Sequence, residues 1–282
     1  MVMLRSVLTT LLLILLAGVL LALGLRWLEP ALIYFPTVRV ERTPREAGMA
    51  YREVAVTTRD GESLKGWWVP AAAPDAPALL FFHGNAGNRE HRLHNLQGLH
   101  AAGIAVFIFD YRGYGGSTGK PSEDGLLLDG EAAYDWLRGE VGDRPIFIFG
   151  RSLGGAVAAL IALRRPAAGL ILESTFTSAR AMAIRVVPIP GIGYIARTRL
   201  DVLAAVRRLT LPMLFIHGEQ DEVVPFRMGR TLYEAAATSD KTFHAVPGGH
   251  HNDTYLLAGE AYWSWLVDFT ARGQPGRDAR KR

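Results

Sequence analysis

The stretch that decides the fold is IFIFGRSLGGAVAALIALRR, residues 146–165. Its first four residues are apolar and favour a buried strand, and the apolar run from Leu153 is typical of a helix. Between them stands G-x-S-x-G, residues 150–154, in which the glycines permit a sharp strand-to-helix turn around a serine. The sequence therefore predicts that Ser152 is a nucleophile that faces the amino-terminal end of a helix. The alternative is that Ser152 only caps this helix.

Further apolar runs and helical segments flank this stretch on both sides. Alternation in residues 52–57 and 63–69, joined by Asp60-Gly61, predicts a β-hairpin at an antiparallel edge. The remaining runs predict a doubly wound, mostly parallel α/β sheet with helices on both faces, which binds ligands at the carboxyl ends of its strands. The predicted parallel strands are 78–82, 104–109, 146–149, 169–172, 213–216 and 242–246, and the predicted helices are 88–102, 124–140, 153–164, 226–237 and 254–271.

Two loops after later strands carry the partners that a nucleophilic serine needs. Asp221 follows the run 213–216, and His250 and His251 follow the last strand, so the order is serine, acid, histidine. The acid would orient the imidazole, and the histidine would move protons to and from the serine. Spacing alone does not separate the two histidines. The alternatives to Asp221 are Glu173, Glu219 and Glu222, and the histidines expected in packing or solvated roles are His91, His94, His100, His217 and His244.

Two backbone N–H groups are candidates for an oxyanion hole. The stretch HGNAGN, residues 83–88, ends an early strand, and its small residues let a substrate approach the backbone. We expect the N–H groups of Asn85 and Leu153 to bind the developing oxyanion. A second G-x-S-x-G match surrounds Ser117, but Lys120-Pro121 follows it instead of a helix. We therefore interpret the segment around Ser117 as a glycine-rich loop.

The amino-terminal segment is typical of a membrane anchor. Residues 6–25 contain no charge, and as a helix at ~1.5 Å per residue they span ~30 Å, the thickness of a bilayer core. We predict an uncleaved, single-pass anchor over residues 1–27. A cleaved signal peptide is the alternative, although its apolar stretch is normally shorter. Arginines on both sides leave open which side of the membrane carries the catalytic domain.

Composition limits the remaining choices. The chain has 282 residues and no cysteine, which excludes disulfides, thiolate metal sites and cysteine nucleophiles. The net charge of +4 arises in the basic tail, so the rest lacks the basic stripe that nucleic-acid binding requires. We predict one α/β domain over residues 28–271 and a disordered tail over residues 272–282. We expect no metal, no cofactor and no nucleic-acid partner.

The chain resembles the α/β-hydrolase superfamily, and more narrowly its membrane-anchored group of bud-emergence-type hydrolases and abhydrolase-domain proteins. The resemblance runs from about Leu32 to Trp265 and implies the α/β-hydrolase fold. In that group the catalytic histidine is followed by Asn-Asp, which implies that His251 is the base. The resemblance rests on LIYFPT (32–37), HGNAGN (83–88), FDYRGYG (109–115), GRSLG (150–154), ESTFTS (173–178) and HND (251–253).

The segment between two late strands bears on the substrate. Residues 175–209 predict a small apolar cap, which favours acyl chains, although core packing with a Pro-Gly turn is an equal alternative. Members of the group resemble carboxylesterases, lipid-chain hydrolases or thioesterases. We expect a serine hydrolase that cleaves acyl esters or thioesters of lipid or lipidated substrates through an acyl-enzyme. The alternatives are a membrane-tethered binding protein without catalysis, a peptidase and an acyltransferase. The sequence predicts no oligomeric state.

Overall fold

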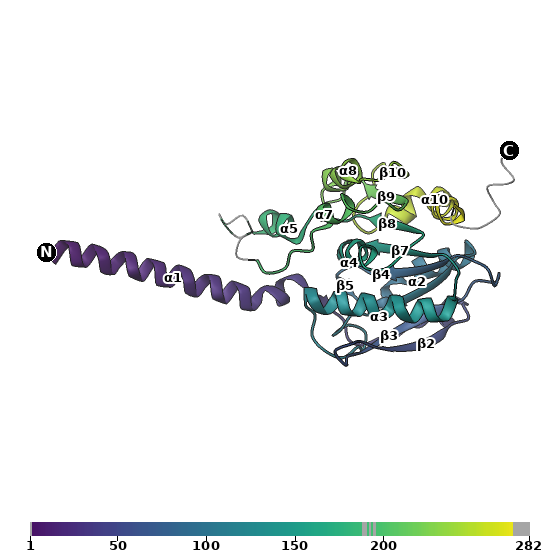
Figure 1. Cartoon of the computed structure of the whole chain (residues 1–282), viewed down its shortest axis with the longest axis horizontal. Coiled ribbons are helices and arrows are strands. Elements are labelled where there is room, and N and C mark those ends of the chain that lie inside the picture. The colour runs from purple at the N-terminus through teal and green to yellow at the C-terminus, as the bar shows by residue number, and fades with distance from the viewer. Residues whose placement is uncertain (1, 188–190, 192, 194–195, 273–282) are drawn as a thin grey trace.

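The computed structural model describes residues 2–187, 191, 193 and 196–272, and it shows a long helix that leads into a layered α/β domain (Figure 1). The strands are β1 (Phe35–Pro36), β2 (Arg52–Thr57), β3 (Ser63–Val69), β4 (Ala78–Phe82), β5 (Ala86–Gly87), β6 (Ala105–Phe109), β7 (Ile146–Arg151), β8 (Gly169–Glu173), β9 (Met213–Gly218) and β10 (Lys241–Val246). The helices are α1 (Val2–Ile33), η1 (Pro44–Ala47), η2 (Arg89–Arg92), α2 (Leu93–Ala101), α3 (Glu123–Val141), α4 (Leu153–Ala162), α5 (Ala179–Val186), α7 (Val202–Val206), α8 (Phe226–Ala235), α9 (Thr254–Ala258) and α10 (Glu260–Ala271).

The main sheet has the order β10-β9-β8-β7-β4-β6-β3-β2. Its strands pair in parallel from β10 to β6, and β3 pairs antiparallel to both β6 and β2. The predicted mostly parallel sheet with an antiparallel hairpin at its edge is therefore confirmed. The strand β7, which leads to Ser152, lies in the interior of the sheet between β4 and β8. The carboxyl ends of neighbouring parallel strands consequently meet around Ser152.

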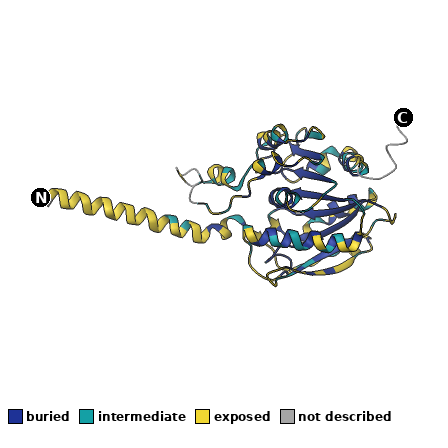
Figure 2. Ribbon diagram, in the orientation of Figure 1, coloured by how far each residue is buried: buried dark blue, intermediate teal, exposed yellow. Residues whose placement is uncertain are grey.

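Each face of the sheet packs against its own layer of helices. Side chains alternate along a strand, so Phe82 of β4 joins one core cluster with Leu126 of α3, while Phe81 joins a second cluster. The second cluster includes Leu96 of α2 and Leu266 of α10. Figure 2 shows the resulting buried strands in dark blue. Burial on both faces explains why these strands appear in the sequence as uninterrupted apolar runs.

The turn from β7 into α4 is tight and strained. Ser152 adopts φ 54° and ψ −121°, in a region that residues with a side chain rarely occupy. A Cβ at Gly154 would overlap the backbone of Phe82 and His83, and one at Gly155 would overlap Thr175. Since these overlaps are absent with glycine, the first turn of α4 packs directly on β4 and on the loop after β8.

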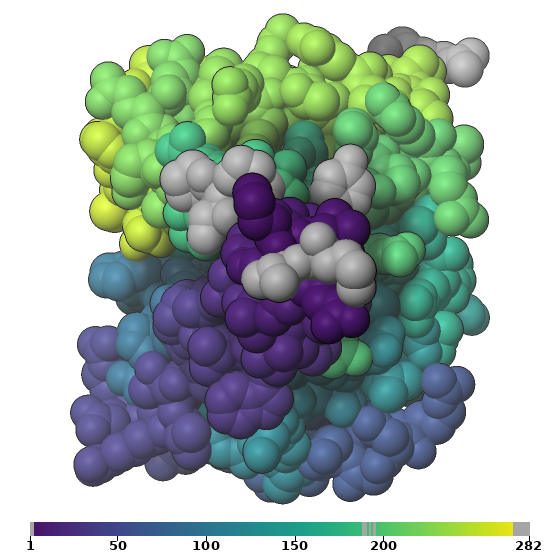
Figure 3. Space-filling model, turned by 90° about the vertical axis from the view of Figure 1, so that its left-hand side faces the viewer, coloured from purple at the N-terminus to yellow at the C-terminus, as the bar shows by residue number. Residues whose placement is uncertain are grey.

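Helix α1 continues beyond the predicted anchor boundary at residue 27 and ends at Ile33. Residues Met3–Ile33 are long and apolar enough to cross a membrane, and most of their side chains are exposed (Figure 2). The helix continues past Pro30, and Ile33 in its last turn packs against the core of the domain. Figure 3, which looks along α1, shows the helix in purple at the middle of one face of the domain. The helix is therefore both a candidate membrane span and a part of the folded domain.

The predicted cap and the predicted basic tail are described only in part. In the expected cap over residues 175–209, the described part contains helices α5 and α7, joined by a segment that the structure describes only in part. In the expected basic tail, Arg272 follows α10 and the remaining residues, 273–282, lie outside the described residues.

Alanine substitutions at Gly154, in the tight turn, and at Gly139, in α3, should change the free energy of unfolding in opposite directions. Gly154→Ala should lower the free energy of unfolding by about 3 kcal/mol or more, because the methyl group meets backbone that cannot move aside. Gly139→Ala is the control, since Gly139 lies on the exposed side of α3 with open space around its Cα. It should raise the free energy of unfolding by about 1 kcal/mol. Urea unfolding of the detergent-solubilised protein measures both, and a Gly154→Ala protein as stable as the wild type contradicts the packing argument.

Candidate active site

Ser152, His251 and Asp221 form one connected chain of hydrogen bonds at the carboxyl edge of the sheet. Ser152 Oγ lies 3.1 Å from His251 Nε2, and His251 Nδ1 lies 2.8 Å from Asp221 Oδ2. With the proton on Nδ1, His251 donates to the carboxylate and accepts from the serine hydroxyl. The structure thus brings together the three side chains singled out in the sequence, and a single imidazole contacts both of the others.

Asp221 is held as a carboxylate by its surroundings. Its Oδ1 accepts hydrogen bonds from the backbone N–H groups of Val223 at 3.0 Å and Val224 at 2.7 Å. Burial alone would raise the pKa of Asp221, but the hydrogen bonds from His217, His251 and the backbone outweigh burial and hold this pKa well below its usual range. Asp221 is therefore negatively charged at neutral pH and is suited to stabilise an imidazolium.

His250, the neighbour of His251, has a different partner. Its Nδ1 lies 3.2 Å from Glu222 Oε2, and the side chains of His250 and Glu222 are 52% and 59% exposed. His251, in contrast, is buried against Ser152. Of the alternative acids considered, Glu222 thus pairs with the surface histidine, and Glu219 is exposed. The geometry distinguishes the two histidines where their spacing does not.

A buried cluster beneath the site fixes the histidine loop. Arg151 Nη2 donates to the carbonyl oxygen of His251 and, at 3.0 Å, to Asn252 Oδ1. Its Nε lies 3.6 Å from Glu173 Oε1, and Glu173 also accepts from Thr254 Oγ1 and from Tyr262 Oη. Sequence reasoning did not identify this cluster, although a charged residue beside the nucleophile and another at the end of β8 were available signals. We call Arg151 and Glu173 the loop clamp.

His217 is buried beside the loop that carries Asp221. It was expected in a packing or solvated role, and it is buried at the end of β9. Its Nε2 lies 2.9 Å from the carbonyl oxygen of Val224 and 3.3 Å from Asp221 Oδ2. His217 therefore supports the loop that carries Asp221.

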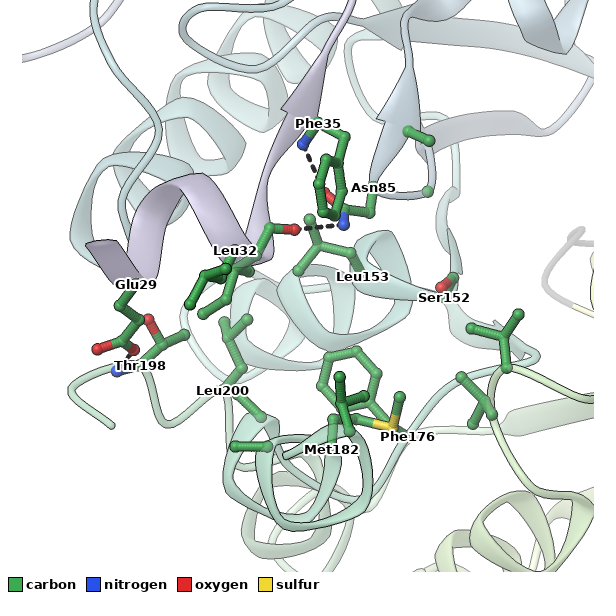
Figure 4. Close-up of a pocket in the computed structure, with 18 of the residues that line it drawn as sticks. Glu29, Leu32, Phe35, Asn85, Ser152, Leu153, Phe176, Met182, Thr198 and Leu200 are labelled. Carbon is green, nitrogen blue, oxygen red and sulfur yellow. Dashed lines mark hydrogen bonds between the residues drawn. The ribbon is translucent and has the colours of Figure 1, made fainter. Parts of the chain in front are cut away.

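The two predicted oxyanion residues line the same cavity as Ser152, and their environments differ. Leu153 opens α4, so its N–H has no carbonyl partner within the helix. The side chain of Asn85 points toward the end of α1, where Nδ2 donates to the Ile33 carbonyl and Oδ1 accepts from Phe35 N at 3.3 Å (Figure 4). Among the described residues, the Asn85 N–H donates to no acceptor. Both backbone groups are therefore available to a ligand.

Ser117, the serine of the second motif, has a structural environment. Its hydroxyl donates to the carbonyl oxygen of Asp110 at 2.9 Å and accepts from Lys65 N at 2.9 Å. These bonds fasten the glycine-rich loop to β3 and leave Ser117 buried.

A cavity of about 550 Å³ opens beside Ser152 and has the size of a small-molecule site. Its walls are largely apolar, and they include Phe176, Met182 and Leu200 of the domain (Figure 4). Leu32 in the last turn of α1 and Phe35 of β1 line it as well. Within the described ranges no group of three or more His, Asp or Glu side chains is arranged to hold a metal ion.

Comparisons with known proteins agree with this fold. A family model described as serine aminopeptidase, S33, matches residues 73–197 and 192–254. The solved structure of the Pyrococcus furiosus esterase Pf2001 is similar with a TM-score of 0.72 at 23% identity, covering 85% of this chain and 98% of the esterase. At this identity the likeness shows the fold.

Two relatives in sequence define the group more closely. The chain is 37% identical over 273 residues to protein bem46 of Schizosaccharomyces pombe, with 91% of this chain and 90% of the relative covered. It is 33% identical over 243 residues to the lysophosphatidylserine lipase ABHD12 of Rattus norvegicus, with 75% and 60% covered. The chain therefore belongs to the α/β-hydrolase superfamily, in the group that includes bem46 and the abhydrolase-domain proteins.

Proposed function

We propose that this protein is a membrane-anchored serine hydrolase that cleaves acyl esters of lipid-like substrates. The observation that carries the proposal is the imidazole of His251, which lies between Ser152 Oγ and the Asp221 carboxylate beside an apolar cavity. A helix cap would not need an acid-oriented histidine at its hydroxyl, so the arrangement supports a nucleophile over a capping role for Ser152.

The geometry supports a two-step reaction. His251 Nε2 removes the proton of Ser152 as its Oγ attacks the ester carbonyl, and Asp221 stabilises the imidazolium. The N–H groups of Asn85 and Leu153 stabilise the tetrahedral oxyanion. His251 then gives its proton to the departing alcohol or thiol, which leaves an acyl group on Ser152. Water, activated by the same histidine, hydrolyses this acyl-enzyme.

The cavity supports an apolar acyl group over a peptide substrate. An aminopeptidase needs an anionic group to hold the free amine of its substrate, and Glu29 is the carboxylate among the residues that line the cavity. Both oxygens of Glu29 already accept backbone N–H groups, from Arg197 and Thr198. The identity of 33% with a lysophosphatidylserine lipase also favours a lipid ester.

Membrane attachment follows from α1 in this proposal. Its apolar side chains are exposed along the candidate span Met3–Ile33, and exposed leucines over this length are stable in a bilayer core. We infer that α1 is retained as a single-pass anchor.

The nucleophile can be tested with a pair of serine variants. Ser152→Ala should lower kcat on p-nitrophenyl butyrate by about 10⁴-fold or more and should abolish labelling by a fluorophosphonate. Ser117→Ala is the control, because the buried Ser117 hydroxyl is bonded to the backbone of Asp110 and Lys65. It should be labelled like the wild type, with the modified peptide containing Ser152 in mass spectrometry. Labelling of the Ser152→Ala protein would refute the assignment.

The two adjacent histidines give a second prediction. His251→Ala should lower kcat by at least about 10³-fold, because the serine loses its base and the acid loses its partner. His250→Ala should cost less than about tenfold, since the ring pairs with Glu222 at the surface. Steady-state kinetics decides, after circular dichroism shows that both variants fold. The reverse order of effects would transfer the base to His250.

A further inference from the structure

We infer that the last turns of α1 form one wall of the acyl-chain site, so that the chain of a membrane lipid enters along the anchor and lies between α1 and α5. This inference rests on the proposed function and deepens it. It gives α1 a part in substrate selection in addition to attachment, and it identifies the substrate as an acyl ester that resides in the bilayer.

The walls of the cavity come from two segments that are distant in the sequence. Leu32 of α1 and Phe35 of β1 line it on one side, and Met182 and Val186 line it from α5. Leu32, Phe35 and Val186 are also 59%, 54% and 69% exposed, so the cavity has an apolar rim. A rim of this kind favours contact with acyl chains over contact with water.

A buried carboxylate fixes α1 against the cap segment. Glu29 is 8% exposed, and its two oxygens accept hydrogen bonds from the N–H groups of Arg197 and Thr198, each at 2.7 Å. Figure 4 shows Glu29 beside Thr198. A buried carboxylate is stable only where its oxygens find such donors. The domain therefore fixes the position of the end of α1. Leu200, which follows Arg197 and Thr198 closely in the sequence, lines the same cavity.

The chain after α1 is bonded to the predicted oxyanion loop. The side chain of Asn85 contacts both the carbonyl of Ile33 and the N–H of Phe35. Directly afterwards β1 pairs in parallel with β5, in the register Phe35↔Ala86. The wall of the cavity and the residue whose N–H we propose for the oxyanion hole are thus held by the same contacts.

The position of the cavity at the end of a candidate membrane span favours a lipid acyl chain as its occupant. The candidate span is one continuous helix from Met3 to Ile33, and Leu25 and Leu32 of this helix both line the cavity. Arg26 and Glu29 line it between them, and the Glu29 carboxylate is already bonded to the cap segment. Figure 3 shows that α1 emerges from the same face as the cap, which is coloured green beside it. A lipid chain that follows Leu25 and Leu32 stays in contact with apolar groups and avoids transfer through water.

Two tryptophan substitutions on the same helix test the inference. Leu32→Trp places a larger ring in the cavity and should lower the ratio of kcat/KM for p-nitrophenyl palmitate to that for p-nitrophenyl butyrate by at least about tenfold. Leu28→Trp is the control, because Leu28 is exposed and does not line the cavity. It should leave this ratio within about twofold of the wild type. An unchanged ratio in Leu32→Trp, or an equal fall in both variants, overturns the inference.

A covalent probe gives a measurement that does not depend on turnover. A long-chain alkyl fluorophosphonate with a diazirine at the end of its chain, bound to Ser152 in detergent-solubilised wild type, should cross-link to a peptide within residues 25–35 on irradiation. Cross-links only to other segments overturn the inference and leave the proposed function standing. Failure of the wild type to react with the probe or to hydrolyse either ester overturns the proposed function and, with it, this inference.

Discussion

The close contact between the first turn of α4 and strand β4 is the constraint on which the site depends. Without a side chain, Gly154 packs against the backbone of Phe82, and this contact holds Ser152 at a positive φ. The same turn carries the serine, the Leu153 N–H beside it and Arg151 of the loop clamp. Strain at one residue is maintained because the packing on both sides determines the backbone. One close packing contact therefore positions the proposed nucleophile, a proposed oxyanion donor and the arginine that holds the histidine loop.

Much of the fold was predictable because burial on two faces leaves a clear pattern. Strands such as β4 and β7 appear as short apolar runs, and the predicted strand limits differ from the observed ones by two residues or fewer. Asp221 and His251 were predictable as loop residues because parallel strands end at one edge of the sheet. The choice between His250 and His251 depends on side-chain direction, which spacing does not encode. There the resemblance to a family favoured His251, the histidine that the structure places beside Ser152.

Other features depend on contacts that no local pattern contains. Residues 6–25 of α1 carry no charge on any side, so this segment marks no face that packs against protein. The carboxylate of Glu29, just after the apolar segment, was the one sequence signal that α1 contacts the domain. Its partners, Arg197 and Thr198, lie 168 and 169 positions later in the chain. Glu173 was an alternative for the catalytic acid in the sequence analysis. Its hydrogen bonds from Thr254 and Tyr262, which give it a structural role, are known only from the structure. Long-range hydrogen bonds therefore account for the part of the site that was not predicted.

The long separation between Glu29 and its partners also has a consequence for biogenesis. Glu29 leaves the ribosome well before Arg197 and Thr198, which follow 168 and 169 residues later. At about 5–20 residues per second, its partners appear about 10 to 30 s afterwards. During this interval the carboxylate has only water to solvate it, because an ionised side chain is costly within the hydrocarbon core. For the anchor proposed above, Glu29 therefore limits how deeply the nascent helix inserts, and the register of that helix in the bilayer is set before the domain has been synthesised.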